Sequence, residues 1–389
     1  MSDTSIIKGV VIILIAFIII LCLIFLKNKR KEITLIIISS AIALVVAEFG
    51  LRSFLPQTTD YGHMIAYDST LGWKFIANGK GVMAHRGTTP NVIETNSLGF
   101  RDHAPSDKKK KKLMVLGDSF VANIAIQDKE VFTEIMEDQL EAYDVMNFGV
   151  SGYGQVQEYL LLEKWIDVIN PDVIMLIVYL QNDFANNMGT HGFYARPSAV
   201  LEGEDSVVTI RRQSKDLEIE RGFNNIFSKS HVNWLVTRAI NNLFSTADSL
   251  YVTEVYTCQS PIPDDHEVAF KIMEELLVKI AQLGKKKNVP VIFALAPSIL
   301  QVDDELWTLF LEKNGFRKKN YLRSSPNDRI MQFAKTNSLM MLDLLPVFLD
   351  EEKRNVKCYH PVEQHWTKEG NEVVAKALLD YLNANSLTK

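Results

Sequence analysis

The distribution of apolar residues divides the chain into two regions. Residues 9–26 contain no charged side chain (GVVIILIAFIIILCLIFL), and a second apolar run covers residues 33–47. From residue 113 onward, short apolar runs alternate with stretches in which apolar residues recur at helical spacing. This pattern predicts membrane-associated helices at the N-terminus, followed by a domain of alternating strands and helices.

The alternating region predicts five strands. Strands are expected at 113–117, 143–147, 173–180, 289–296 and 339–344, and helices at 132–142, 155–169, 267–283, 327–336 and 368–383. Residues 173–180 are apolar throughout, which is typical of a strand covered on both faces. We therefore expect a three-layer α/β domain with five parallel strands. Residues 184–265 interrupt the alternation and predict an insertion over the sheet edge, and residues 56–106 predict an irregular segment packed on the domain.

The two N-terminal runs bear on the cellular compartment. Residues 9–26 suffice for about one bilayer crossing at ~1.5 Å per residue. The basic stretch 27–31 (KNKRK) follows them where a signal peptide would have a cleavage site of small residues. We expect residues 1–55 to form two transmembrane helices joined by a cytoplasmic basic loop, with residues 56–389 outside the cytoplasm. If the second run lies only at the interface, the same loop places the large domain in the cytoplasm.

The net charge and the number of cysteines indicate whether nucleic-acid binding and disulfide bonds are to be expected. A net charge of −5 gives no electrostatic reason to expect binding to nucleic acid. Five lysines at 108–112 follow Pro-Ser-Asp at 105–107, which predicts a solvated loop before a strand. Three cysteines do not make a disulfide framework. Cys258 and Cys358 are expected to be free thiols, and their pairing stays open for a domain outside the cytoplasm.

A serine follows the first predicted strand of the domain. Ser119 stands in the sequence GDSF, directly after strand 113–117 and at the expected start of a helix. A serine at this position is either a helix N-cap or a nucleophile that a histidine activates. Its own N–H, at a helix start, can point at a developing oxyanion. We expect the preceding Asp118 to fix the turn.

Three further stretches place polar groups at the same end of the predicted sheet. Gly152 in NFGVSGYG (147–154) has no side chain, so its backbone N–H can approach a ligand closely. Asn182 in QND can donate its amide to an oxyanion. His365 in EQHW precedes the last helix and is a candidate general base. Each feature alone fits a turn or a structural role, but their combination favours a nucleophilic site.

In this order, the four stretches resemble the conserved blocks of the SGNH/GDSL hydrolase superfamily. The resemblance implies Ser119 as nucleophile, His365 as base, and Gly152 and Asn182 as oxyanion donors, with Gly149 the less favoured glycine. It also implies a flavodoxin-like α/β/α fold. The stretch NSLGFRD at 96–102 resembles a segment of membrane-anchored bacterial members, which implies an inner or plasma membrane location. The resemblance covers about residues 94–384, except much of the insertion.

Two positions depart from the pattern of the superfamily. Leu180 stands where the third block usually has glycine, and Val362 stands three residues before His365, where many members have aspartate. Glu363, two residues before the histidine, is the candidate orienting acid, and a Ser–His dyad is the alternative. The Cys, His and Glu side chains between 358 and 365 match no common zinc spacing. We expect neither a metal nor another cofactor.

The sequence thus predicts a serine esterase of the SGNH/GDSL type. Its substrates would be acyl esters, above all O-acetyl esters, of cell-envelope glycans or lipids, cleaved through an acyl-serine intermediate. With a sugar hydroxyl in place of water, the same site would be an O-acyltransferase. A non-catalytic glycan-binding or partner module is the third alternative. A membrane acyltransferase is kept as a further partner, and the acyl group, the acceptor and the oligomeric state stay open.

Overall fold

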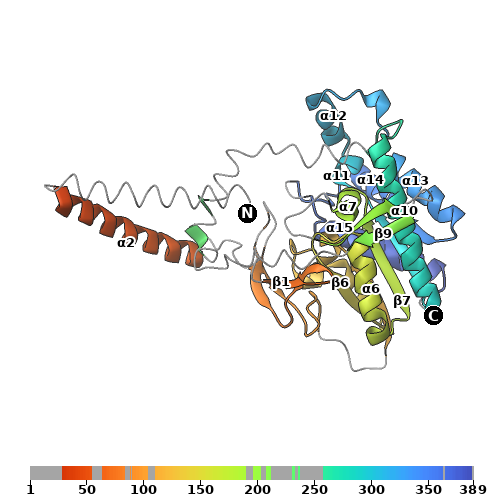
Figure 1. Ribbon diagram of the computed structural model, residues 1–389, viewed down its shortest axis with the longest axis horizontal. Helices are drawn as coiled ribbons and strands as arrows, with labels where there is room; N and C mark the ends of the chain where they lie inside the picture. Colours follow the sequence, from red (N-terminus) through yellow and green to blue (C-terminus); the bar gives the residue numbers. More distant parts are fainter. Residues whose placement is uncertain are drawn as a thin grey trace. The chain divides into compact units, whose positions relative to one another are not determined.

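The protein is described from a computed structural model (Figure 1). The residues it describes are 29–54, 64–83, 88, 90–103, 110–189, 196–202, 207–211, 230–232, 235–236, 257–361 and 364–387. The chain forms two compact units, one of Met1–Thr59 with Asp216–Ser245 and one of Asp60–Lys215 with Thr246–Lys389.

A five-stranded parallel sheet lies at the centre of the larger unit (Figure 1). Its strands are β5 (Lys111–Gly117), β6 (Tyr143–Gly149), β7 (Val173–Tyr179), β10 (Val291–Ala296) and β11 (Met340–Asp343). The spatial order is β11-β10-β7-β5-β6, and all four neighbouring pairs are parallel. This is the flavodoxin-like order, in which the first strand lies between the second and the third. The predicted α/β class and the five predicted strands are confirmed.

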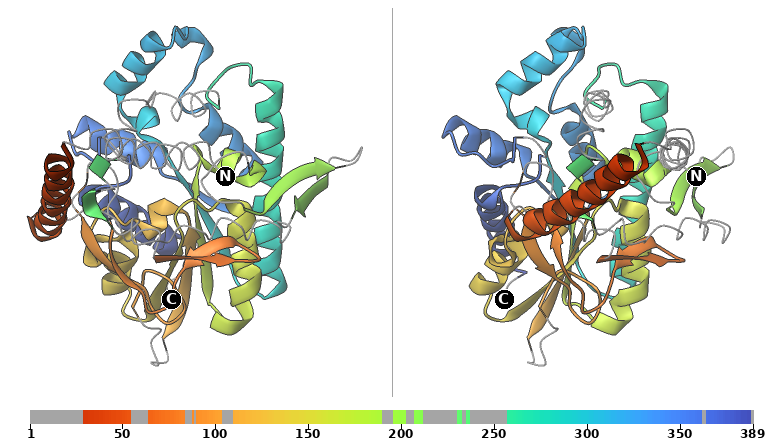
Figure 2. Two further views of the ribbon diagram at one scale, coloured as in Figure 1. Left: turned by 60° about the vertical axis from the view of Figure 1, so that its left-hand side comes forward. Right: turned by 90° about the vertical axis from the view of Figure 1, so that its left-hand side faces the viewer.

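Side chains of each strand alternate between two apolar layers. In β5, Leu113 and Val115 belong to one buried cluster, and Met114 and Leu116 belong to the other. One layer is completed by α5 (Phe132–Gln139), α14 (Leu345–Lys353) and α15 (Lys368–Ala384), and the other by α6 (Gln155–Ile169), α10 (Asp264–Lys286) and α13 (Ser325–Thr336). Figure 2 shows the sheet enclosed by these helices. Burial on both faces explains why the strands are apolar throughout.

Residues 64–94 are more regular than the sequence predicts. Instead of an irregular segment, they form two antiparallel hairpins, β1 (Ile65–Asp68) with β2 (Gly72–Phe75), and β3 (Lys80–Met83) with β4 (Asn91–Glu94). Each strand has only four residues, too short for a clear alternation of polar and apolar positions. Trp73, Phe75, Met83 and Ile93 are buried and hold the hairpins on the domain core. The segment is therefore ordered by tertiary packing.

Part of the predicted insertion at 184–265 is described. Helix α7 (Asp183–Met188) leads into it, and the hairpin of β8 (Ser198–Glu202) and β9 (Val207–Arg211) packs near α7 and α10 (Figure 2). The remaining described elements of the larger unit are short. They are α4 (Ser119–Ala122), α11 (Ile299–Val302), α12 (Asp304–Lys313) and the 3₁₀ turns Asp128–Glu130 and Lys318–Asn320. Cys258 and Cys358 are buried, and no disulfide joins them.

The described part of the smaller unit is dominated by α2 (Arg30–Phe54). The segment Lys31–Phe54 is long and apolar enough to cross a membrane, and its apolar side chains are exposed within the unit. The apolar run 33–47 is therefore part of a helix longer than the run itself. Arg52 donates a hydrogen bond to Glu48, four residues before it on the helix, at 2.8 Å. Glu48 also accepts hydrogen bonds from the backbone N–H groups of His231 and Val232. The first apolar run, 9–26, lies outside the described residues.

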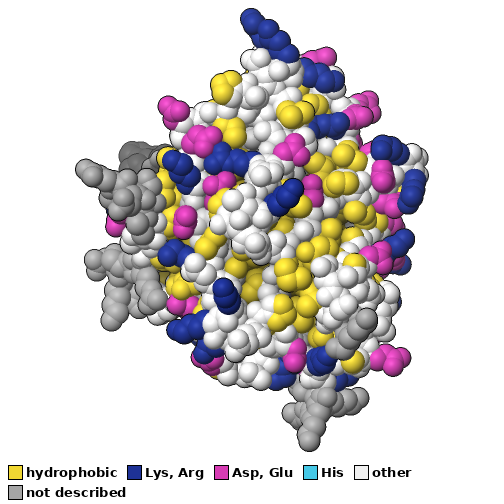
Figure 3. Space-filling view, turned by 90° about the vertical axis from the view of Figure 1, so that its right-hand side faces the viewer, with side chains coloured by type: hydrophobic (Ala, Val, Ile, Leu, Met, Phe, Trp, Pro, Cys, Tyr) yellow, Lys and Arg dark blue, Asp and Glu magenta, His cyan; other side chains and the backbone are white. Residues whose placement is uncertain are grey.

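Acidic and basic side chains are interspersed on the face of the molecule shown in Figure 3. They surround hydrophobic side chains that are exposed singly or in small groups. Among the described residues of the larger unit, the exposed large hydrophobic ones are Val92, Val168, Val268, Leu309 and Leu322. Such isolated exposure is normal for a folded domain.

Candidate active site

Three predicted site residues follow three adjacent strands. Ser119 comes after β5, Gly152 after β6 and Asn182 after β7, and β5 is hydrogen-bonded to both of the other strands. Because parallel strands present their carboxyl ends at one edge, the three residues come to the same edge of the sheet. The strand order reverses at this edge, which is the position where open parallel sheets generally bind their ligands. The fold therefore positions the first three motifs together.

The turn that carries Ser119 is built around Asp118 and Gly117. Asp118 is the N-cap of α4, and its carboxylate accepts a hydrogen bond from Phe120 N–H at 2.8 Å. A Cβ atom on Gly117 would lie 2.4 Å from the Val121 side chain, so glycine permits the tight passage from strand to helix. Ser119 is the first residue of the helix and not its cap. The structure thus assigns the capping role to Asp118, as expected, and leaves the Ser119 hydroxyl available for another role.

Asp118 brings the serine and the asparagine to one carboxylate oxygen. The Ser119 hydroxyl lies 3.4 Å from Asp118 Oδ2 in donor geometry, and Asn182 Nδ2 donates to the same oxygen at 3.3 Å. Burial raises the pKa of Asp118, while the Phe120 N–H, the charge of His365 and the Asn182 amide favour its ionised form. An amide nitrogen has two N–H bonds, so Asn182 can hold Asp118 with one and offer the other to a substrate.

His365 lies beside this turn. Its ring centroid is 4.9 Å from that of Phe120, the residue after the serine, and its charge acts on Asp118. The next residue, Trp366, is fully buried, with its ring centroid 4.8 Å from that of Phe120. Its carbonyl accepts a hydrogen bond from Asn123, at the end of α4. The buried tryptophan therefore anchors the loop of the histidine to the helix of the serine.

Gly152 has a backbone conformation that favours glycine, with φ of +81°. Its loop is joined to the serine turn by a hydrogen bond from Val150 N–H to Gly117 C=O, at 3.1 Å. Within the part of the chain that the structure describes, no hydrogen bond involves the Gly152 N–H. Gly149 packs against α4 instead, since a Cβ atom there would lie 2.4 Å from Ala122 N. Of the two glycines, Gly152 is the one with a free donor.

Glu363 and Val362 lie outside the described residues, so the prediction of Glu363 as orienting acid stays a prediction. Leu180, in place of the usual glycine, is buried in the core cluster around β7. The residues Ser119, Gly152, Asn182 and His365 are all described. The structure brings Ser119 and Asn182 together at Asp118, places His365 beside Phe120, and joins the loop of Gly152 to the same turn.

The sequence patterns did not predict two buried acids near this site, Asp183 and Glu158. Asp183 follows Asn182 and accepts hydrogen bonds from Tyr179 N–H and from the Gln155 side chain. Burial raises the pKa of Asp183 and of Glu158 well above the usual carboxyl range. The charge of Asp118 raises both further, and the charge of Asp183 also raises the pKa of Glu158. A signal was present, because Glu158 lies on the buried face of the predicted amphipathic helix 155–169.

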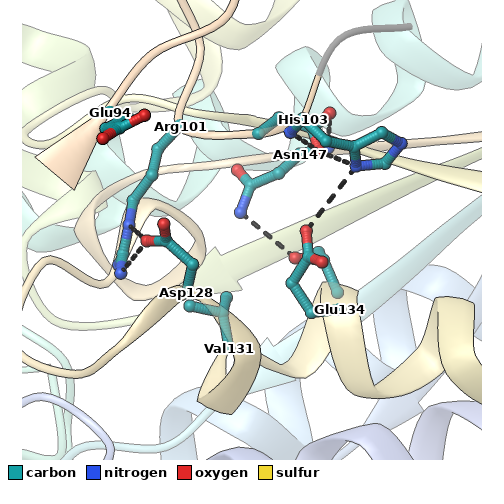
Figure 4. A pocket seen from close by; sticks show the side chains of 9 residues that line it. Glu94, Arg101, His103, Asp128, Val131, Glu134 and Asn147 are labelled. Carbon is teal, nitrogen blue, oxygen red and sulfur yellow. Dashed lines mark hydrogen bonds and ion pairs between the residues drawn. The ribbon is translucent and has the colours of Figure 1, made fainter. Parts of the chain in front are cut away.

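A pocket of about 190 Å³ lies around His103 (Figure 4). His103 Nδ1 is 2.9 Å from an oxygen of Asp102, and its Nε2 is 3.2 Å from an oxygen of Asp144. The hydrogen bond with Asp102 and the nearby acids raise the pKa of His103 to about 10. Two groups of three side chains there could hold a metal ion, Asp102-His103-Glu134 and His103-Glu137-Asp144. A charged imidazole satisfies the same acids without an ion.

No protein-family model and no curated protein matches the sequence. Solved structures do match it. A member of the lipolytic protein G-D-S-L family from Veillonella parvula is 12% identical, with a TM-score of 0.35, over 69% of this chain and 97% of its own. An acetyl xylan esterase is 16% identical, with a TM-score of 0.36, over 69% and 98%. A psychrotrophic esterase from Pseudoalteromonas sp. is 10% identical, with a TM-score of 0.37, over 71% and 98%. The chain is similar to GDSL lipolytic proteins and esterases.

Proposed function

We propose that the protein is a serine esterase that cleaves acyl esters through an acyl-serine intermediate. The observation that carries the proposal is the meeting of the Ser119 hydroxyl and the Asn182 amide at Asp118, with His365 beside them. A serine hydroxyl is a weak nucleophile until a base takes its proton, and a histidine near neutrality suits that role. A hydroxyl, a histidine and amide donors at one sheet edge are the parts that acyl transfer needs.

The reaction would proceed in two halves. His365 takes the proton of Ser119 as its oxygen attacks the ester carbonyl, and the resulting oxyanion accepts hydrogen bonds from the Gly152 and Ser119 N–H groups and the Asn182 amide. The tetrahedral intermediate collapses, and the proton passes from His365 to the leaving alcohol. Water, activated in turn by His365, then releases the acid and restores the serine. Glu363 is proposed to orient the histidine, and a dyad without it is the alternative.

The experiment compares two buried serines at the starts of short helices. Ser119→Ala is expected to abolish hydrolysis of p-nitrophenyl acetate and labelling by a fluorophosphonate probe, because both require the nucleophile. Ser298, at the start of α11, is similarly buried, so Ser298→Ala is the matched control and is expected to keep both activities. Full activity of Ser119→Ala would refute the mechanism. A folded wild-type protein that neither turns over nor labels would favour the non-catalytic module. Glu363→Gln separates triad from dyad, since only a triad loses activity strongly.

The substrate and location are proposed from the anchor and the site together. A helix able to span a membrane precedes the catalytic domain, so we propose acetylated glycans or lipids of the cell envelope as substrates, with the domain outside the cytoplasm. Protease treatment of intact spheroplasts tests the location, because only an outer domain is digested. Mass spectrometry of the envelope tests the direction of transfer. A Ser119→Ala strain gains acyl groups if the enzyme is a hydrolase and loses them if it is an O-acyltransferase.

A further inference from the structure

The loop that carries Gly152 (residues 150–154, here called the oxyanion loop) is held by two side chains from outside the four motifs. The indole Nε1–H of Trp73, on β2, donates to the Ser151 carbonyl at 3.1 Å. Arg196, just ahead of β8, donates from Nη1 to the Gly152 carbonyl at 2.9 Å. The guanidinium of Arg196 also lies over the Trp73 ring, 4.8 Å from its centroid. The carbonyl groups on both sides of the Gly152 N–H are therefore fixed.

The geometry of the peptide bond gives these contacts a consequence. The Ser151 carbonyl and the Gly152 N–H belong to one planar peptide unit, in which they point in opposite directions. When Trp73 holds the carbonyl on one side, the N–H faces the other side. A hydrogen bond accepted by a peptide carbonyl also polarises the unit and makes its N–H a better donor. Gly152, at φ of +81°, has few steric restraints of its own, so the orientation must come from its neighbours.

Both side chains are themselves buried and fixed. Trp73 is 3% exposed, and the ring of Tyr153 packs edge-on against it at 5.6 Å between centroids. The Tyr153 hydroxyl donates to the Trp73 carbonyl, which ties the hairpin back to the oxyanion loop. Arg196 is 9% exposed. A cation stacked on an indole and hydrogen-bonded to a buried carbonyl has little freedom to move.

We propose that Trp73 and Arg196 are positioning residues that orient the Gly152 N–H toward the oxyanion. The inference rests on the proposed esterase function, and it gives the hairpins at 64–94 a part in catalysis. Neither residue touches the reacting atoms in this scheme. Each acts through the peptide units that flank Gly152, so its removal weakens the stabilisation of the transition state more than the binding of substrate.

The test uses Trp73→Phe in the full-length protein, which keeps an aromatic ring and removes the N–H donor. We expect kcat to fall roughly 10-fold, less than for the loss of a whole oxyanion donor, with KM nearly unchanged. Labelling by a fluorophosphonate should slow by a similar factor, since the probe also builds negative charge on an oxygen as the Ser119 Oγ–P bond forms, fluoride leaves and His365 takes the proton. The pH profile of kcat/KM should keep its shape, because the base is untouched.

Controls separate the possible failures. Trp307→Phe alters an equally buried tryptophan in another cluster and is expected to keep wild-type kinetics. Arg196→Met is expected to lower kcat with little change in KM. If Trp73→Phe does not fold, Arg196→Met tests the proposed positioning role in its place. A folded variant of either residue with wild-type kcat and labelling rate overturns the proposal. If the wild-type protein shows no turnover and no labelling that depends on Ser119, the proposed function itself fails.

Discussion

Replacing Arg101 with methionine should destabilise the catalytic domain strongly. Arg101 is 4% exposed, and its guanidinium donates to the backbone carbonyls of Ala122, Asn123 and Ile126. These carbonyls lie at and just after the end of the helix that begins with Ser119. Arg101 also pairs with Asp128, but that carboxylate is 56% exposed. The buried carbonyls, and not the ion pair, should therefore carry most of the effect.

The magnitude follows from the number of acceptors left without a donor. Each buried polar group without a partner costs about 1–3 kcal/mol. The loss of the donor to three carbonyls should therefore lower the free energy of unfolding by about 4 kcal/mol. This is below the full sum because water can enter the space that the shorter side chain leaves and hydrate some of the carbonyls. Loss of the exposed ion pair adds at most about 1 kcal/mol. Arg101→Lys should lose most of the same stability, because an ammonium group cannot reproduce the planar fork.

Urea denaturation followed by tryptophan fluorescence measures the change, as the shift in midpoint multiplied by the m-value. Asp128→Asn removes the ion pair and keeps the contacts with the carbonyls, so it should cost less than about 1 kcal/mol. Arg354→Met, at an exposed pair with Glu351, is the control for loss of an arginine as such. A loss below 1 kcal/mol for Arg101→Met would refute the reasoning, as would an equal loss for Asp128→Asn.

Three further predictions concern the site and its surroundings. Asn182→Ala should lower kcat about 10²–10³-fold with KM little changed, and a kcat near that of the wild type would exclude it as an oxyanion donor. Because the pKa of His103 is raised to about 10 in the folded protein, its stabilising effect is complete below about pH 6.5 and is lost as the pH rises through 10. Urea midpoints between pH 6 and 10 should therefore fall more for the wild type than for His103→Gln, and parallel curves would contradict this. Burial raises the pKa of the Cys358 thiol to about 12, so iodoacetamide at pH 8 should label it only after unfolding, as mass spectrometry of digests can show.

Local pattern was sufficient for most elements of the sheet domain. The helix predicted at 155–169 is observed with the same limits, and each predicted strand overlaps its observed counterpart. These elements are long or uniformly apolar, so burial of their side chains dictates their form. Helices α12 and α14 and the four strands at 64–94 were not predicted. The strands are too short to show a period, and the packing of Trp73 and Phe75 on the core orders them.

The sequence by itself predicted which residues carry the chemistry. Ser119, Gly152, Asn182 and His365 each follow or precede a predicted element, and a resemblance of motifs links them. Tertiary structure decided which groups meet and what supports them. Asp118 became the shared partner of Ser119 and Asn182 only when β5 and β7 paired. The contact of Trp73 with Ser151 joins residues 78 positions apart, and no local pattern encodes so distant a partner. Local sequence fixes backbone form and residue type, whereas orientation at a site depends on contacts that form only when distant segments pack.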